Sequence, residues 1–217
     1  MLRVPPLVDM GERVGYVAPP HREDRVLRLV YSGSPGKKDL LGNAILGLRD
    51  VKASGAMVQL HLVGVARDAA AGCVAGGARL LDELGDAVVC HGRVGRGEAL
   101  KLVAQAHFST LLRPDKRYAH AGFPTKLVES LSLGVPILTN ITSDIGEYVR
   151  DGKEGVIVDD GSPEAFASAV FRVLRMPHEQ WHAMRVHARQ RACDSFDYRH
   201  YVGPLKTFLE EAMVTCG

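Results

Sequence analysis

The sequence has 217 residues, of which 46% are hydrophobic and 24% are charged, and its formal net charge is +2 at pH 7. This length and composition are typical of a globular protein with one sizeable core. The small net charge excludes the overall basic field that drives nucleic-acid binding, so no nucleic-acid partner is expected. No apolar run reaches the roughly 18 residues of a membrane span, and the N-terminus lacks the apolar segment of a signal peptide.

The four cysteines are far apart in the sequence, at Cys73, Cys90, Cys193 and Cys216. None belongs to a C-x-x-C pair, so the sequence indicates neither a zinc site nor a redox motif. We therefore expect reduced thiols, as in a cytosolic protein.

Residues 1–25 are expected to be an irregular N-terminal segment or linker, because Pro5, Pro6, Pro19 and Pro20 break any helix there. From residue 26 onward, segments with strand and helix patterns alternate. The expected strands are 26–33, 57–64, 87–93, 107–113, 135–140 and 155–160. The expected helices are 36–55, 78–85, 97–106, 124–134, 163–175, 178–193 and 201–213, with a loop at 114–122.

This alternation predicts an α/β fold for residues 26–217, a doubly wound parallel sheet with helices on both faces and a helical C-terminal region. Gly85 and Gly134 stand where the helices before them should end, and Pro124 suits the first turn of its helix. In such a sheet, ligands bind beyond the carboxyl ends of the strands. The loops to consider are those after residues 33, 64, 92, 113 and 139.

The first of these loops has the sequence Gly33-Ser34-Pro35-Gly36-Lys37-Lys38-Asp39. Amide N–H groups at a helix start attract anions, and Lys37 and Lys38 add positive charge, so a diphosphate would fit here. The spacing matches neither a Walker loop nor the G-x-G-x-x-G fingerprint of nicotinamide sites. A plain turn with solvated lysines would explain the same residues.

A second candidate site is the stretch G-F-P-T-K-L-V-E, from Gly122 to Glu129. Lys126 and Glu129 are three residues apart, so they share one face of a helix that starts at the carboxyl edge of the sheet. Lys126 could neutralise a phosphate, and Glu129 could accept hydrogen bonds from two vicinal ribose hydroxyls. The alternative is a surface ion pair between them, which contributes less than about 1 kcal/mol.

Other polar residues carry weaker signals. Arg113 and Arg117 flank the long loop and could reach a phosphate, or could be solvated charges. Trp181 has helical apolar spacing, so a packing role is expected. Four histidines near strand ends have no metal spacing, and core or surface roles are expected for them: His61, His91, His107 and His120.

Three segments follow one another between Gly122 and Val158: F-P-T-K-L-V-E-S-L-S-L-G-V-P-I-L, I-G-E-Y-V-R-D-G and E-G-V-I-V. In order and spacing they resemble the donor-binding region of group 1 glycosyltransferases, a large retaining family with two Rossmann-like domains (the GT-B fold). Members typically have a P-x-K-x-x-E-x-x-x-x-G-x-P-V-I segment and then E-x-V-x-D-G-x-x-G. Weaker matches, L-V-Y-S-G, H-L-V-G and H-G-R-V, extend the resemblance over roughly residues 26–212.

The resemblance implies that this chain is the nucleotide-sugar-binding half of such an enzyme. Glu129 would then bind the ribose, while Lys38 or Lys37 would contact the diphosphate with Lys126 beside it. Lys38 and Lys126 are the candidate catalytic residues, because cations stabilise the charge that develops on a leaving diphosphate. The other implied donor-binding residues are Gly33, Ser34, Gly92, Arg93, Gly122 and Phe123, with Gly92 and Arg93 beside the base.

Two departures from the family pattern concern the site. The family often has a second glutamate eight residues before the one at Glu129, and Ala121 stands there. It also often has an arginine directly after the glycine of the first strand, and Ser34 stands there. Sugar activation and diphosphate binding are therefore expected to differ from the usual arrangement. No D-x-D motif is apparent, so we expect lysines in place of a metal, and no cofactor.

Only one Rossmann unit fits in this chain, and the family binds its acceptor with an N-terminal domain. The expected partners are a UDP- or GDP-linked sugar, a glycan or lipid-linked glycan as acceptor, and an N-terminal Rossmann domain in the same or another chain. We expect the isolated chain to be inactive. The expected location is the cytoplasm. Peripheral attachment to the inner membrane, through the other half of the enzyme, is an open alternative.

Three alternatives remain at this stage. The first is that the chain is one half of a nucleotide-sugar epimerase, an enzyme class with the same two-domain fold. A non-catalytic subunit would use the cleft only for binding, or not at all, and Ala121 favours this alternative slightly. A nicotinamide-dependent dehydrogenase is disfavoured because the glycine fingerprint is absent.

Overall fold

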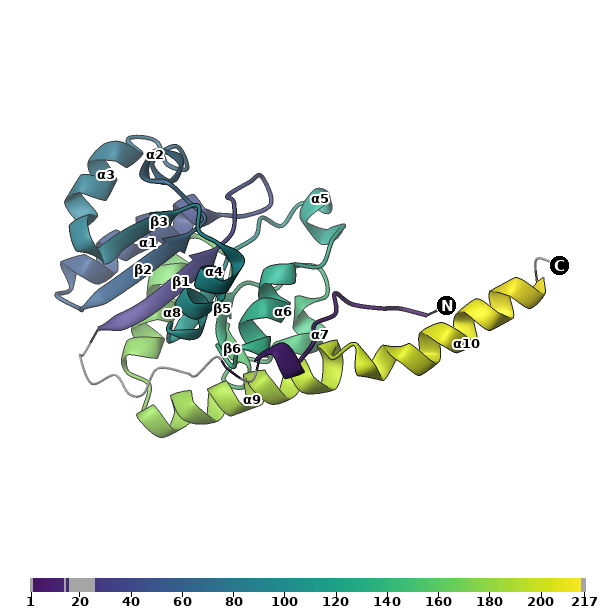
Figure 1. Cartoon of the computed structure of the whole chain (residues 1–217). Helices are drawn as coiled ribbons and strands as arrows, with labels where there is room; N and C mark the ends of the chain where they lie inside the picture. Colours follow the sequence, from purple (N-terminus) through teal and green to yellow (C-terminus); the bar gives the residue numbers. More distant parts are fainter. Residues whose placement is uncertain (1, 14, 16–25, 216–217) are drawn as a thin grey trace.

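The computed structural model describes residues 2–13, 15 and 26–215. In this part of the chain, six strands form one sheet in the order β3-β2-β1-β4-β5-β6, and all neighbouring strands are parallel (Figure 1). The predicted parallel α/β fold is therefore confirmed. The strands are β1 (Leu27–Ser32), β2 (Val58–Val63), β3 (Val88–Gly92), β4 (Phe108–Leu111), β5 (Ile137–Thr139) and β6 (Gly155–Ile157).

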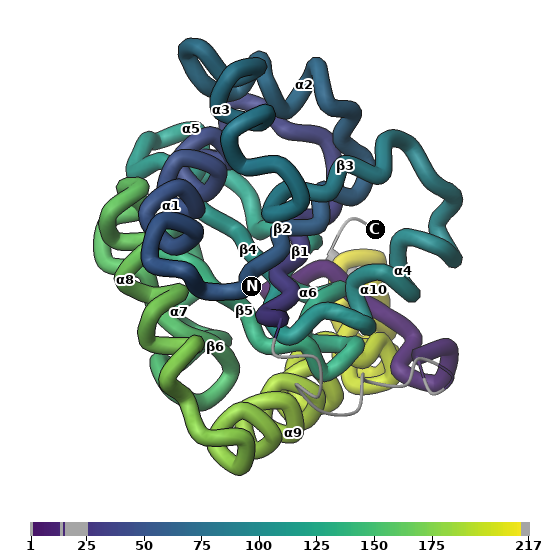
Figure 2. The backbone as a smooth tube through the Cα atoms, turned by 90° about the vertical axis from the view of Figure 1, so that its left-hand side faces the viewer, coloured from purple at the N-terminus to yellow at the C-terminus, as the bar shows by residue number. Residues whose placement is uncertain are grey.

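Helices pack against both faces of this sheet, as Figures 1 and 2 show. One face is covered by α1 (Leu41–Ala53), α2 (Arg67–Ala71), α3 (Gly77–Leu84) and α8 (Pro163–Leu174). The other is covered by α4 (Arg96–Ala104), α6 (Thr125–Ser132) and α7 (Ile145–Tyr148). α9 (His178–Phe196) contributes buried residues on both sides, and α10 (Arg199–Thr215) leads away from the sheet.

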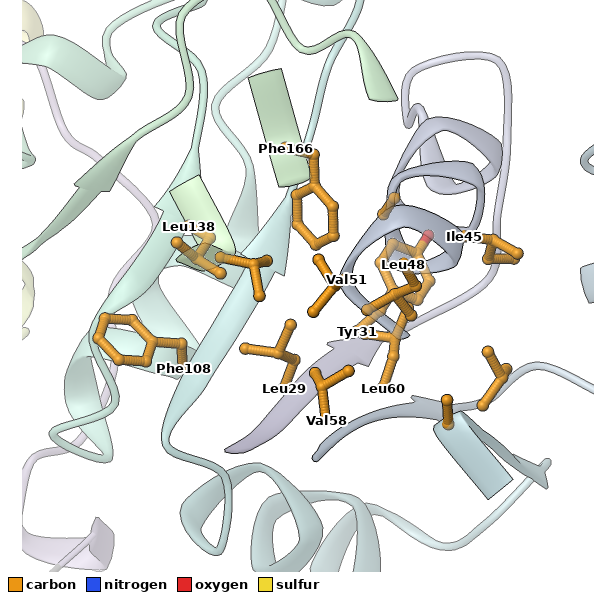
Figure 3. Packing of buried hydrophobic residues seen from close by; sticks show 14 of the residues in the cluster. Leu29, Tyr31, Ile45, Leu48, Val51, Val58, Leu60, Phe108, Leu138 and Phe166 are labelled. Carbon is orange, nitrogen blue, oxygen red and sulfur yellow. The ribbon is translucent and has the colours of Figure 1, made fainter. Parts of the chain in front are cut away.

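The alternation of side chains along β1 explains why two layers form. Leu29 and Tyr31 point into the cluster that contains Ile45 of α1 and Phe166 of α8 (Figure 3). Val30, between them, packs in the separate cluster on the α4 side. Because successive side chains of a strand face opposite sides, β1 is apolar on both faces, as expected for a central parallel strand.

The helix ends follow their glycines. α3 ends at Leu84 before Gly85, and α6 ends at Ser132 shortly before Gly134; both glycines have positive φ, 52° and 65°. Pro124 precedes the first residue of α6 instead of lying in its first turn. The sequence prediction missed α2, α7 and α5 (Arg117–His120), because helices of four or five residues are too short for a periodic pattern.

The C-terminal helices were predicted correctly in number and order. Trp181 of α9 is buried, and its Nε1 donates a hydrogen bond to the His107 carbonyl at 3.0 Å, so its packing role is confirmed. α10 starts at Arg199, slightly earlier than predicted, and contains Pro204. No helix of the described residues is long and apolar enough to cross a membrane.

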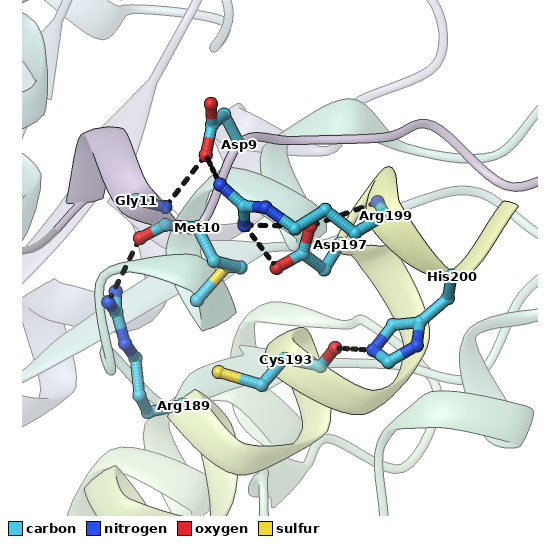
Figure 4. A network of polar contacts seen from close by, with 8 residues as sticks. All are labelled: Asp9, Met10, Gly11, Arg189, Cys193, Asp197, Arg199 and His200. Carbon is cyan, nitrogen blue, oxygen red and sulfur yellow. Dashed lines mark hydrogen bonds and ion pairs between the residues drawn. The ribbon is translucent and has the colours of Figure 1, made fainter. Parts of the chain in front are cut away.

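The described part of the N-terminal segment is attached to the junction of α9 and α10. The amide of Val8 donates to the Phe196 carbonyl at 2.9 Å, and the amide of Tyr198 donates to the Val8 carbonyl at 3.1 Å. Next to this bridge, Arg199 binds the carboxylates of Asp9 and Asp197 (Figure 4). Residues 2–13 therefore pack on the domain, while the assignment of residues 1–25 as a linker stays a prediction.

Three of the cysteines, Cys73, Cys90 and Cys193, are free thiols. Burial raises the pKa of the Cys73 and Cys90 thiols, which disfavours their reactive thiolate form. Cys216 lies outside the described residues.

The close packing of α1 on α8 predicts opposite effects for two glycine substitutions. A Cβ at Gly47 would lie 2.4 Å from the Pro163 carbonyl oxygen, whereas a Cβ at Gly97 of α4 would meet nothing within 4 Å. Gly47→Ala should lower the free energy of unfolding by about 1–3 kcal/mol through overpacking. Gly97→Ala should leave it unchanged or raise it by up to about 1 kcal/mol. Urea denaturation measures both, and equal effects would contradict the packing.

Candidate functional site

Three glycines lie side by side where β1, β2 and β3 end. Gly33, Gly64 and Gly92 all have positive φ, and the amides of Gly33 and Gly64 donate to the carbonyls of Val63 and Gly92 at 2.8 Å each. A Cβ at Gly33 would lie 2.6 Å from Cε of Lys126. A side chain at position 33 would therefore displace the lysine, so glycine is needed both for its backbone conformation and for space.

Lys126, the second residue of α6, contacts two side chains that are far from it in the sequence, Tyr31 and Asp39. Its Nζ donates to the Tyr31 hydroxyl at 2.7 Å and forms an ion pair with the Asp39 carboxylate. The Tyr31 hydroxyl in turn donates to Oδ2 of Asp39 at 2.6 Å. Nζ also lies 4.2 Å from the centre of the Tyr31 ring, a cation–π contact. These contacts tie the loop after β1 to the start of α6.

Burial and neighbouring charges set the protonation of this cluster. Burial lowers the pKa of Lys126, the Asp39 carboxylate counteracts this shift, and the nearby Arg113 adds to it. Burial, and then the hydrogen bond to Asp39, raise the pKa of Tyr31 well above its usual range. The Tyr31 hydroxyl therefore stays protonated and acts as a donor to Asp39 at neutral pH.

A pocket of about 320 Å³ opens next to Lys126, beyond the carboxyl ends of β1 and β4. The strand order reverses between these two strands, which is where open α/β sheets bind ligands. We call it the cation pocket; it is lined by Ser34, Gly36, Lys37, Lys38, Asp39, Leu111, Arg113, Gly122, Phe123, Pro124, Thr125 and Lys126. It thus brings together residues of both candidate sites.

The lysines of the first loop lie at the edge of this pocket. Lys37 and Lys38 are exposed, and a Cβ at Gly122 would lie 3.6 Å from Nζ of Lys38. Lys38 therefore faces the loop that starts the second site. Phe123 lines the pocket, but its ring packs against Tyr148 and Phe196, with centroids 5.2 and 5.9 Å away. This packing holds the backbone of the loop in place.

Four of the predicted residues do not line the cation pocket: Gly33, Gly92, Arg93 and Glu129. Glu129 lies on the same helix as Lys126, is half-buried, and makes no hydrogen bond or ion pair with any described side chain. The close ion pair of Lys126 is therefore with Asp39 and not with Glu129, whose charge only raises the Lys126 pKa from further away. Gly92 and the exposed Arg93 lie further along the same edge, at the end of β3.

Sequence reasoning treated Arg113 and Arg117 as equivalent, and the structure separates them. Arg117 of α5 is exposed, whereas Arg113 is only 3% exposed, so a solvated role for Arg113 is wrong. The Arg113 guanidinium donates through Nη1 to the Gly122 carbonyl at 3.1 Å. Its backbone is held by the buried Asn140, which accepts from the Arg113 amide at 2.8 Å and donates to its carbonyl at 2.7 Å.

His61 and His91 form a pair that sequence spacing did not reveal. They stand on the neighbouring strands β2 and β3, with Nδ1 of His61 and Nε2 of His91 3.0 Å apart. Burial, and then the proximity of His91, lower the pKa of His61 to about 4. Among the described residues, no group of three histidine, cysteine or acidic side chains is placed to hold a metal ion.

The fold and this pocket define a Rossmann-like domain with a pocket lined by basic side chains at the carboxyl edge of its sheet. Comparison with known proteins gives the family: residues 28–176 match the model of the group 1 glycosyl transferases, which is more than half of the chain. The chain therefore belongs to the group 1 glycosyl transferase family.

One relative is a Salmonella typhimurium protein assigned by name to colanic acid biosynthesis as the glycosyltransferase WcaL. It is 26% identical over 89 residues, a segment that covers 41% of this chain and 22% of the relative.

Two solved structures share the fold. The glycosyltransferase from Rickettsia africae ESF-5 superimposes with a TM-score of 0.75 at 12% identity, covering 96% of this chain and 56% of that one. Anabaena Alr3699/HepE, solved with UDP and glucose, has a TM-score of 0.69 at 16% identity, with coverage of 94% and 55%. This chain thus spans little more than half the length of these glycosyltransferases.

The ion pair at Lys126 predicts a change in protonation when its partner is removed. Asp39→Asn should lower the pKa of Lys126 further, because the Asp39 carboxylate is the strongest influence that raises it. Lysine side-chain NMR titrations of the two proteins measure the shift, with Lys126→Arg to assign the signal. Asp50→Asn, an exposed substitution with the same change of charge, should leave the Lys126 pKa unmoved. An unchanged Lys126 pKa in Asp39→Asn would contradict the contact.

Proposed function

We propose that this chain is the donor-binding half of a retaining glycosyltransferase that takes a sugar from a nucleotide-diphosphate sugar. The observation that carries the proposal is the cation pocket, where Lys38 and Lys126 face one space at the switch point of the sheet. Membership of the group 1 family supports it, as does the likeness in fold to Anabaena HepE, which was solved with UDP and glucose.

In this reaction the bond between the anomeric carbon and the oxygen of the distal phosphate breaks, and its electron pair stays on the diphosphate. The acceptor hydroxyl forms the new bond to the anomeric carbon, and its proton passes to an oxygen of the leaving diphosphate. Negative charge therefore grows on the leaving group, and fixed cations in a partly dry pocket stabilise it. Lys38 and Lys126 would supply these charges, which is why we propose that the transfer needs no metal.

The contacts of Lys126 leave room for this role. A lysine ammonium has three N–H donors, and Tyr31 and Asp39 engage two of them. The third can bind a phosphate oxygen from the cation pocket. Asp39 and Tyr31 would then orient Lys126 rather than replace its ligand. The exposed Lys37 and Lys38 carry no such partner among the described residues and would complete the phosphate contact.

The free carboxylate of Glu129 suits the ribose. It is half-buried on the helix that carries Lys126, and no described side chain occupies it. A carboxylate can accept both hydroxyls of a ribose in charge-assisted hydrogen bonds. The base would then extend toward Gly92 and Arg93 at the end of β3, and the sugar toward Gly122 and Phe123.

The acceptor side of the reaction needs a second half. The chain covers 55–56% of the solved glycosyltransferases compared above, and we propose that an N-terminal Rossmann domain, in the same or another chain, binds a glycan or lipid-linked glycan acceptor. A non-catalytic nucleotide-sugar-binding subunit would use the same pocket without transfer, and the following measurement separates the two.

The isolated chain should bind a nucleoside diphosphate weakly and transfer no sugar, because acceptor groups and closure of the cleft are missing. Addition of the N-terminal half should restore transfer for an enzyme and leave it absent for a binding subunit. Calorimetry with UDP and GDP and release of radiolabelled sugar measure the two properties. Rapid turnover by the isolated chain would show that the half-enzyme proposal is wrong.

Glu129 and Lys126 should affect different parts of the donor. Glu129→Ala should weaken nucleoside binding by roughly 1.5–3 kcal/mol per lost charged hydrogen bond at most, and Glu129→Gln by less, because the amide oxygen still accepts. Lys126→Ala should weaken binding of the diphosphate more than of the nucleoside. Calorimetry with a nucleoside and its diphosphate at fixed salt tests this, since charge contacts are screened. Parental nucleoside affinity in a folded Glu129→Ala protein rejects the ribose assignment.

A further inference from the structure

Arg113 is a buried cation without an acidic partner of its own. It follows the end of β4, lines the cation pocket and is 3% exposed. One of its five N–H donors binds the Gly122 carbonyl, and no described carboxylate lies within ion-pair distance of it. Buried polar groups are rarely left without partners, and a buried charge is costly unless it is compensated. The remaining donors are available to a ligand in the pocket.

The charges around the pocket do not balance. The charge of Arg113 lowers the pKa of Lys126, and Asp39 is the acid that raises the pKa of both, while Glu129 raises that of Lys126 alone. Asp39 is already held by Tyr31 and Lys126. Arg113 therefore has no carboxylate of its own, and the exposed lysines of the first loop add further positive charge. An anion with several oxygens would complete this arrangement.

The position of Arg113 is fixed before any ligand arrives. Asn140, at the end of β5, binds both the amide and the carbonyl of Arg113, and it is buried. These two bonds fix the backbone of Arg113, and the Gly122 carbonyl holds Nη1 of its guanidinium. A phosphate can accept further N–H bonds from this side chain with little loss of side-chain freedom.

We propose that Arg113 binds the diphosphate of the donor and supplies, from the end of β4, the guanidinium that the family usually places after the glycine of the first strand, where this chain has Ser34. The inference rests on the proposed function for the nature of the ligand. The anion site itself can be tested without a nucleotide, with inorganic pyrophosphate as the probe.

The experiment compares calorimetric titrations of pyrophosphate and UDP into the parent chain, Arg113→Gln and Arg117→Gln at fixed salt. Arg113→Gln should weaken pyrophosphate binding about tenfold or more, because charged hydrogen bonds are lost from a buried site. Arg117→Gln removes the same charge from an exposed position outside the pocket and should change the affinity less than about twofold. Circular dichroism checks that each variant is folded.

Arg113→Lys covers the case in which Arg113→Gln does not fold. It keeps the charge but loses the planar pair of donors, so pyrophosphate should bind at least about threefold more weakly. Parental affinity for pyrophosphate in either folded variant would overturn the role of Arg113, as would a parent chain that binds no pyrophosphate. A parent that binds pyrophosphate in an Arg113-dependent way but does not bind UDP or GDP would support the anion site and reject the proposed donor.

Discussion

The ion pair between Asp39 and Lys126 is the contact on which the rest of the site depends. It joins residues 87 positions apart in the sequence and fixes the loop after β1 against the first turn of α6. Tyr31 and the absence of a side chain at Gly33 make the contact possible. Without it, the loop lysines and the start of α6 would have no common position, and the cation pocket would have no defined wall.

The same ion pair also sets the electrostatic character of the pocket. Asp39 counteracts the lowering of the Lys126 pKa by burial and so favours the charged ammonium. One carboxylate cannot compensate both Lys126 and Arg113, however. Backbone and side-chain contacts hold both cations in place, so the proposed binding of an anion would need little rearrangement.

Much of the fold could be predicted from sequence, because each strand and long helix has its own local pattern. The candidate lysines could be placed at the carboxyl edge for the same reason. Asp39 and Arg113 could not be assigned, since their roles depend on partners from distant segments: Lys126 for one, Gly122 and Asn140 for the other. The His61–His91 pair was missed likewise, because it arises from the register of β2 and β3. Residue types alone do not encode such pairs.

The topology explains why Arg113 and Ser34 line the same pocket. In a parallel sheet, the carboxyl ends of all strands open on one edge, so residues that follow different strands can reach the same ligand. The loops after β1 and β4 are such neighbours, because these strands pair directly at the switch point. A cation on either loop can therefore place its charge in this pocket. On the loop after β4, Asn140 holds the backbone of Arg113 and the Gly122 carbonyl holds its guanidinium.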